Sequence, residues 1–187
     1  PLRGSVEIPQ AESAIEATSL DECDVRVARL QAHKDAWVAL GVSERILILE
    51  ELREGLSAIA EDWVAAACQA KGVAKGSGGE GEEWLGGPFT TMRNLRLLVG
   101  ALEDIAAHGR PRAPGPVRTR SNGQLAVKVF PCEIWDKVFY AGFNAEIWLQ
   151  EGPTAENLAE YQASVYRRKA HGEHPEAKVA LVLGAGN

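Results

Sequence analysis

The last ten residues constrain the fold of this chain more than any other segment. They read Lys178-Val179-Ala180-Leu181-Val182-Leu183-Gly184-Ala185-Gly186-Asn187, an apolar run followed by a Gly-x-Gly turn. Such a run is typical of a parallel β-strand that is buried on both faces. A glycine turn after such a strand is where α/β enzymes bring backbone close to a nucleotide. The segment therefore predicts the beginning of a nucleotide-binding domain, with the ligand-holding helix expected after residue 187.

The composition and net charge of the chain exclude several classes of protein. A chain of 187 residues can bury a hydrophobic core, and 45% hydrophobic with 25% charged residues is typical of globular proteins. The net charge of −6 argues against a general affinity for nucleic acid or anionic membranes. The sequence shows neither an apolar stretch that could span a bilayer nor an export signal. We therefore expect a cytoplasmic protein with no nucleic-acid or membrane partner.

Apolar residues at helical spacing predict a helical N-terminal region at residues 25–116. The three helices expected there are residues 25–40, 43–71 and 82–107. Gly86-Gly87-Pro88 is predicted to break the third helix near its start. The preceding residues 1–24 are acidic and are expected to form a partly disordered leader. The glycine-rich residues 72–81 are expected to form a flexible loop.

The pattern changes to β-structure after residue 116. Asn122-Gly123 separates two runs rich in β-formers, which predicts a hairpin at residues 117–131 with a type I′ turn. A short strand is expected at residues 144–150, and Thr154 is expected to cap a helix through residue 169. Residues 132–187 would then begin a nucleotide-binding domain. The predicted fold is an α+β fragment of an α/β enzyme, with a helical half, a hairpin and the first strand-helix-strand of a Rossmann-like domain.

The cysteines and histidines give no clear site. Cys23, Cys68 and Cys132 are far apart and lack C-x-x-C spacing, so neither a disulfide framework nor a zinc site is indicated. We expect each of the three to have a structural role. His171 and His174 lie in a loop without a third ligand at a defined spacing, so no metal site is predicted.

Three segments resemble a known family. They are Glu83-Trp84-Leu85-Gly86-Gly87-Pro88, Asp136-Lys137-Val138-Phe139-Tyr140-Ala141-Gly142-Phe143 and the last ten residues. Together with the order of the elements, they resemble a bacterial branch of the aldehyde dehydrogenase superfamily over roughly residues 30–187. The resemblance implies the N-terminal part of an NAD(P)-dependent enzyme that acts on an aldehyde or activated acyl substrate through a covalent thiohemiacetal. It also implies a nucleophilic cysteine in a downstream lobe, a homo-oligomer, and a fragment that is inactive alone.

The same resemblance implies site residues at the end of the chain. In the familiar members the first nucleotide-domain strand ends in Pro-Trp-Asn, and the asparagine helps to stabilise an oxyanion. Asn187 matches that asparagine, while Ala185 and Gly186 replace the proline and tryptophan. Leu183, Gly184 and Gly186 would place backbone beside the nicotinamide ribose of NAD or NADP. A cap of the following helix is the alternative role for Asn187, because asparagine is a preferred N-cap residue.

Two other functions stay open at this point. A self-standing helical interaction or assembly domain would pair its hairpin and terminal strand with a partner chain. A dinucleotide-binding protein of the Gly-x-Gly-x-x-Gly type would need a third glycine three residues after Gly186. The hairpin is also similar to the one that aldehyde dehydrogenases use in subunit assembly. Arg118, Arg120 and Lys128 are expected to form either its solvated face or its inter-subunit face.

Overall fold

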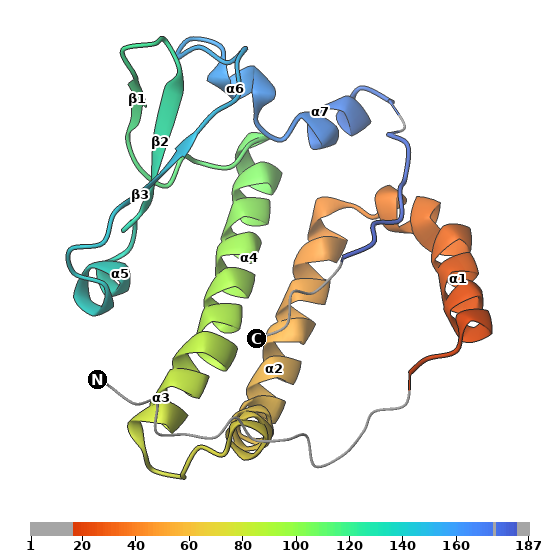
Figure 1. Cartoon of the computed structure of the whole chain (residues 1–187). Coiled ribbons are helices and arrows are strands. Elements are labelled where there is room, and N and C mark those ends of the chain that lie inside the picture. Colours follow the sequence, from red (N-terminus) through yellow and green to blue (C-terminus); the bar gives the residue numbers. More distant parts are fainter. Residues whose placement is uncertain (1–16, 174, 183–187) are drawn as a thin grey trace. The chain divides into compact units, whose positions relative to one another are not determined.

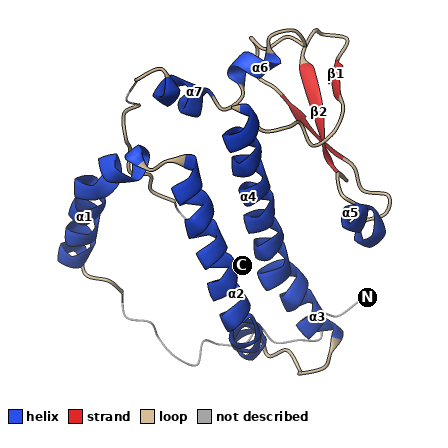
Figure 2. Ribbon diagram, turned by 180° about the vertical axis from the view of Figure 1, so that it is seen from behind, coloured by secondary structure: helices blue, strands red, loops and turns tan. Residues whose placement is uncertain are grey.

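The structure, a computed structural model, describes residues 17–173 and 175–182 (Figure 1). The chain divides into two compact units, one that extends to Gly100 and resumes at Glu176, and one that comprises Ala101–Pro175. The described residues form helices and one small antiparallel sheet, which Figure 2 shows in separate colours. The predicted α+β class is therefore confirmed.

The first unit is helical. Its elements are α1 (Leu20–Ala39), α2 (Val42–Lys71), α3 (Gly78–Trp84), the π-helical turn η1 (Leu85–Phe89) and the first part of α4 (Thr90–His108). The three predicted helices are thus present, but their boundaries differ. The unit boundary after Gly100 falls within α4.

Helix α1 begins earlier than the sequence predicts. Ser19 is its N-cap, and the Ser19 hydroxyl accepts a hydrogen bond of 3.2 Å from the Glu22 backbone N–H. Asp21 and Glu22 lie in the first turn, where a negative charge is favourable beside the positive end of the helix dipole. Residues 20–24 of the predicted, partly disordered leader thus belong to α1, and residues 1–16 lie outside the described residues.

Helix α2 is capped by glycines at both ends. Its N-cap is Gly41 rather than the expected Ser43, and the Gly41 N–H donates to Oε2 of Glu44 over 2.7 Å. Gly72 ends the helix as predicted, in the left-handed conformation with φ of 66°. The Val73 N–H donates to the Cys68 carbonyl over 2.8 Å, which satisfies one of the terminal carbonyl groups.

The segment between α2 and α4 is more ordered than predicted. Residues 78–81 belong to α3, so the expected loop over residues 72–81 is shortened to its first half. The α-helix is interrupted at Gly86-Gly87-Pro88 as predicted, although the interruption is the π-helical turn η1 rather than a loop. Proline cannot donate a backbone hydrogen bond. The Thr90 hydroxyl lies 2.6 and 2.9 Å from the carbonyl oxygens of Leu85 and Gly86 and donates to them at the end of this turn.

The core of the first unit is small. Its buried apolar side chains are Leu56, Val64, Cys68, Val99 and Ala177. The Lys34 ammonium group donates to the Ala177 carbonyl over 3.0 Å, which fastens residues after Glu176 to α1. Much of the predicted apolar face of α2 is exposed, since Leu52 and Ile59 are 52% and 54% accessible. Helix α1 contains no buried residue.

The second unit contains the sheet and several short helices. Its elements after α4 are β1 (Val117–Thr119), β2 (Leu125–Phe130), α5 (Ile134–Phe139), β3 (Ala145–Trp148), α6 (Leu158–Tyr161) and α7 (Ser164–Ala170). The strands form an antiparallel meander in the order β1-β2-β3. The predicted hairpin and the predicted strand within residues 144–150 are confirmed.

The hairpin turn differs from the expected type. Only Gly123 of the Asn-Gly pair has a positive φ, at 84°, whereas a type I′ turn needs two such residues. The Gly123 N–H donates to the Arg120 carbonyl over 2.9 Å, and the Arg120 N–H pairs with the Gln124 carbonyl over 2.8 Å. This is the pattern of a three-residue loop that ends in a glycine bulge. The Asn122 side chain accepts from the Gln124 N–H over 3.2 Å.

The residues after β3 depart most from the sequence prediction. The expected helix from Thr154 is split into α6 and α7 by Ala163, which has a φ of 51°. Thr154 does cap this region, because its hydroxyl accepts from the Asn157 N–H over 3.3 Å. Residues 178–182 form no strand, and Leu181 and Val182 are both 85% accessible. In the described residues β3 pairs only with β2, so no parallel strand-helix-strand unit is formed.

Candidate functional site

The catalytic and cofactor residues implied by the sequence cannot be placed. Leu183, Gly184, Gly186 and Asn187 all lie outside the described residues. The described part of that segment ends at Val182 in an irregular, exposed conformation. The best-defined polar site is instead the charged face of the β1-β2-β3 sheet, which carries the three basic residues singled out in the sequence.

An ion pair ties the two outer strands of this face together. On β1, the Arg118 guanidinium group donates to both carboxylate oxygens of Glu146 on β3, at 2.9 and 2.5 Å. Such bidentate pairs are the strongest geometry for arginine and carboxylate. These hydrogen bonds raise the pKa of Arg118 and lower the pKa of Glu146. Ala126 on β2 lies between the two strands and is fully buried.

A second cross-strand contact lies beside the ion pair. The Arg120 guanidinium carbon lies 3.6 Å from the centre of the Trp148 ring, which is a cation–π geometry. The Gln124 side chain accepts from Arg120 over 2.5 Å and donates to the Leu149 carbonyl over 2.8 Å. Arg118 of β1 and Arg120, just after β1, therefore each contact a side chain of β3.

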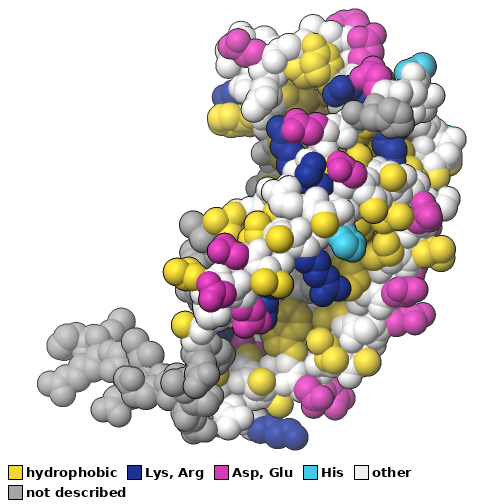
Figure 3. Space-filling view, turned by 90° about the vertical axis from the view of Figure 1, so that its right-hand side faces the viewer, with side chains coloured by type: hydrophobic (Ala, Val, Ile, Leu, Met, Phe, Trp, Pro, Cys, Tyr) yellow, Lys and Arg dark blue, Asp and Glu magenta, His cyan; other side chains and the backbone are white. Residues whose placement is uncertain are grey.

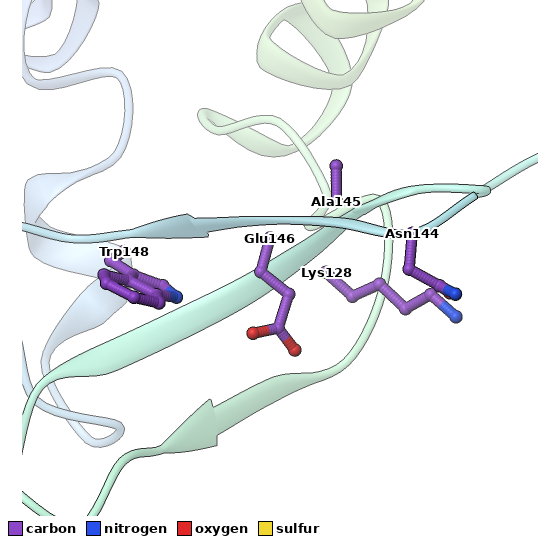
Figure 4. A pocket seen from close by; sticks show the side chains of 5 residues that line it. All are labelled: Lys128, Asn144, Ala145, Glu146 and Trp148. Carbon is purple, nitrogen blue, oxygen red and sulfur yellow. The ribbon is translucent and has the colours of Figure 1, made fainter.

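A surface hollow adjoins these two contacts on the same face. Its volume is about 440 Å³, and its lining includes Lys128, Asn144, Glu146 and Trp148. Figure 4 shows the side chains of Lys128 and Asn144 extending the same way from their strands, whereas Ala145 points to the opposite side. The hollow thus offers an ammonium group, an amide, a carboxylate and an aromatic ring. Such a mixture suits a polar segment of another protein chain better than an apolar small molecule.

The opposite face of the sheet is apolar. Leu125 and Val127 of β2 are buried, while Val117 and Ile147 on the flanking strands are 37% and 54% accessible. Gly115 lies against this sheet so closely that a β-carbon there would be 2.7 Å from the Lys128 carbonyl oxygen. A side chain at position 115 would therefore push the preceding segment away from β2.

Helix α5 presents a cluster of exposed large apolar side chains. Its members are Ile134, Trp135, Val138, Phe139 and, just after the helix, Phe143, all at least 60% accessible. The Trp135 and Phe139 rings are stacked with their centres 6.0 Å apart. On the face that Figure 3 displays, other exposed apolar side chains, in yellow, also lie among acidic and basic ones. Contiguous apolar surface marks interaction sites in folded proteins.

The turn before α5 is fixed by a buried carboxylate. Asp136 is 3% accessible, and its Oδ2 atom accepts from the backbone N–H groups of Cys132 and Glu133, at 3.1 and 3.2 Å. The Cys132 thiol lies 3.4 Å from the same oxygen. The thiol of Cys132 is thus part of the hydrogen-bonded turn that precedes α5.

None of the three cysteines is paired in a disulfide. Burial is the largest cause that raises the pKa of the Cys68 thiol, and Glu80 and Glu83 raise it further. Within residues 17–173 and 175–182, no group of three or more histidine, cysteine, aspartate or glutamate side chains could hold a metal ion. Among the helices of the same residues, none is both long and apolar enough to cross a membrane.

Comparisons with protein-family models, with curated proteins and with solved structures found no match to this chain.

The sequence identified only part of the charged face. It singled out Arg118, Arg120 and Lys128, and the structure places Arg118 and Arg120 against side chains of β3. It missed Glu146, which lies 28 positions from Arg118 along the chain. The available signal was the alternation Glu146-Ile147-Trp148, which places Glu146 and Trp148 on one side of a strand.

Proposed function

We propose that this chain is the N-terminal part of an NAD(P)-dependent aldehyde dehydrogenase-like oxidoreductase. The observation that carries the proposal is the sequence of residues 178–187, in which an apolar run leads into Gly184-Ala185-Gly186-Asn187. The order of the elements before it supports the same assignment: a helical region, a hairpin and a threonine-capped helical segment. In this proposal, residues 178–183 form the first strand of a Rossmann-like domain once neighbouring strands pair with them.

Each part of the chain then has a role in the oxidation of an aldehyde. Nicotinamide, when bound, accepts a hydride from the substrate carbon. Backbone at Leu183, Gly184 and Gly186 would lie beside the nicotinamide ribose. The Asn187 amide would donate a hydrogen bond to the oxyanion that forms when a thiolate attacks the aldehyde. The thiolate would come from a cysteine outside this sequence, since Cys68 is buried and Cys132 lies beside a carboxylate.

An assay of the full-length protein that carries this chain tests the proposal. Purified protein is mixed with a panel of aliphatic and aromatic aldehydes and with either NAD or NADP, and formation of the reduced cofactor is followed by absorbance. The expected result is aldehyde-dependent reduction of one of the two cofactors. Absence of reduction with both cofactors, in a folded protein whose thiols are reduced, would overturn the assignment.

A helical interaction or assembly domain is the second candidate. The exposed apolar cluster at α5 and the charged sheet face favour it, because both have the composition of a protein–protein interface. Sedimentation of the chain alone separates the two candidates when it is combined with the activity assay. A defined oligomer together with an inactive full-length protein supports the assembly domain, whereas cofactor reduction supports the enzyme.

A further inference from the structure

A pocket lies between α2 and α3, and neither of the proposed functions involves it. Its volume is about 640 Å³, which lies within the usual range for sites that hold small molecules between helices. Val64 and Cys68 of α2 line it and are both buried, so they form its floor. Val73 and Trp84 also line it, and the Trp84 side chain is 38% accessible. The pocket therefore combines an apolar floor with an open aromatic wall.

The charged groups around this pocket are mostly carboxylates. Glu61, Asp62 and Glu80 line it, against a single ammonium group from Lys75. The Glu80 carboxylate accepts a hydrogen bond from the Gly76 N–H, which holds it at the pocket. In the described part of the chain neither Glu61 nor Asp62 forms an ion pair. The pocket thus has an excess of negative charge, which Lys75 offsets only in part.

The thiol at the floor reports the same electrostatic potential. After burial itself, the charges of Glu80 and Glu83 are what raise the pKa of Cys68. Lys71, which forms an ion pair of 2.8 Å with Glu83, has a smaller effect that lowers the pKa. Nearby carboxylates therefore act on the thiol at the floor of the pocket as well as on its rim.

We propose that this pocket binds a small organic cation with an apolar body, of the quaternary ammonium class. The cationic head would lie between the carboxylates of Glu61 and Asp62 and the face of the Trp84 ring. Carbon atoms of the ligand would contact Val64 and Cys68. Attraction between a cation and an aromatic face is strongest for tryptophan and grows when the site is shielded from water. An isostere with carbon in place of the charged nitrogen would make the apolar contacts but would lack the attraction to the carboxylates and to the Trp84 ring.

Calorimetric titration of the whole chain with choline, and separately with its uncharged isostere dimethylbutanol, tests the proposal. The expected result is saturable binding of choline to one site and at least tenfold weaker binding of dimethylbutanol. Equal binding of the two compounds would overturn the cationic assignment. Absence of saturable choline binding would overturn the site.

Matched variants locate the binding. Glu61→Gln with Asp62→Asn removes two carboxylates from the pocket, and Trp84→Leu removes the aromatic face. Each should weaken choline binding by about 3- to 30-fold, the range of a cation–π contact or a partly shielded charge pair. Glu51→Gln with Glu54→Gln removes the same charge from α2 outside the pocket and should leave choline binding unchanged. Equal losses in the pocket and control variants would contradict the proposal, and circular dichroism checks that all variants are folded.

Discussion

Arg118 and Glu146 join the two outer strands of the sheet across β2. The guanidinium group of Arg118 donates two hydrogen bonds, of 2.9 and 2.5 Å, to the carboxylate of Glu146. The ion pair connects the two ends of a chain segment that includes the hairpin turn, the cis Phe130–Pro131 bond and α5. It therefore fixes the position of β3 relative to β1 although the two strands share no backbone hydrogen bonds.

This pair makes the sheet sensitive to acid. Hydrogen bonds from Arg118 lower the pKa of Glu146, so the unfolded chain binds a proton at this site more readily than the folded one. The contribution to stability is present above the ordinary glutamate pKa and is lost as the pH falls through the lowered pKa of the folded state. We expect the melting temperature of Glu146→Gln to depend less on pH in this range than that of the unchanged chain. Glu151→Gln, an exposed control, should keep the original pH dependence; equal behaviour of the two variants would refute the role of Glu146.

The Asp136 carboxylate should stabilise the start of α5. Asp136→Ala leaves the backbone N–H groups of Cys132 and Glu133 without their acceptor, and Asp136 is almost fully buried. Loss of hydrogen bonds at a buried site costs about 1–3 kcal/mol in the free energy of unfolding. Urea denaturation measures this loss, with the neighbouring exposed substitution Lys137→Ala as control. A loss no larger than that of the control would show that the carboxylate does not hold the turn.

Two glycine substitutions should change stability in opposite directions. Gly115→Ala places a methyl group 2.7 Å from the Lys128 carbonyl oxygen, so the backbone must shift at a cost of about 1–3 kcal/mol. Gly55 lies inside α2 with open space around its α-carbon, and Gly55→Ala should stabilise the chain by about 0.5–1 kcal/mol. Thermal melts of both variants test the pair of predictions. Two shifts of the same sign would contradict this account of their surroundings.

The three thiols should react with an alkylating agent in a fixed order. Cys23 is exposed and should react first, whereas burial raises the pKa of Cys68 and should make it the slowest. Cys132 is partly accessible but faces the Asp136 carboxylate, so an intermediate rate is expected. Mass spectrometry of peptides after timed alkylation gives the order. Alkylation of Cys68 before Cys23 would contradict the burial of the Cys68 side chain.

Local sequence signals predicted the elements of this fold better than their ends. The period of apolar residues located the helices, and Asn122-Gly123 located the hairpin, because these signals act between neighbours along the chain. The same signals failed where a contact beyond the neighbouring residues determines the local backbone structure. At Gly86-Gly87-Pro88 the chain forms a π-helical turn, with the Thr90 hydroxyl bonded to the Leu85 and Gly86 carbonyl groups, and helix propensity alone does not reveal this.

In the candidate sites, too, the sequence revealed individual residues but not the contacts between distant ones. The basic residues of the hairpin were visible in the sequence. The partner of Arg118, however, depends on the register of β3, which begins at Ala145, 26 positions after β1 ends at Thr119. Position in the sequence also gave no hint of the pocket between α2 and α3, because its carboxylates belong to two helices. The apolar run at residues 178–182 predicts a strand, yet a strand forms only where another strand offers hydrogen bonds.

Turnover of Asn187 variants of the full-length protein tests the central claim most directly. Asn187→Ala removes both the amide donor and the helix cap, whereas Asn187→Asp keeps a capping oxygen and removes only the donor. If Asn187 stabilises an oxyanion, both variants should lower aldehyde turnover by roughly 10²- to 10³-fold, while Asn144→Ala, just before β3, should not. Full turnover in a folded Asn187→Asp variant would contradict the oxyanion role and leave Asn187 as a helix cap.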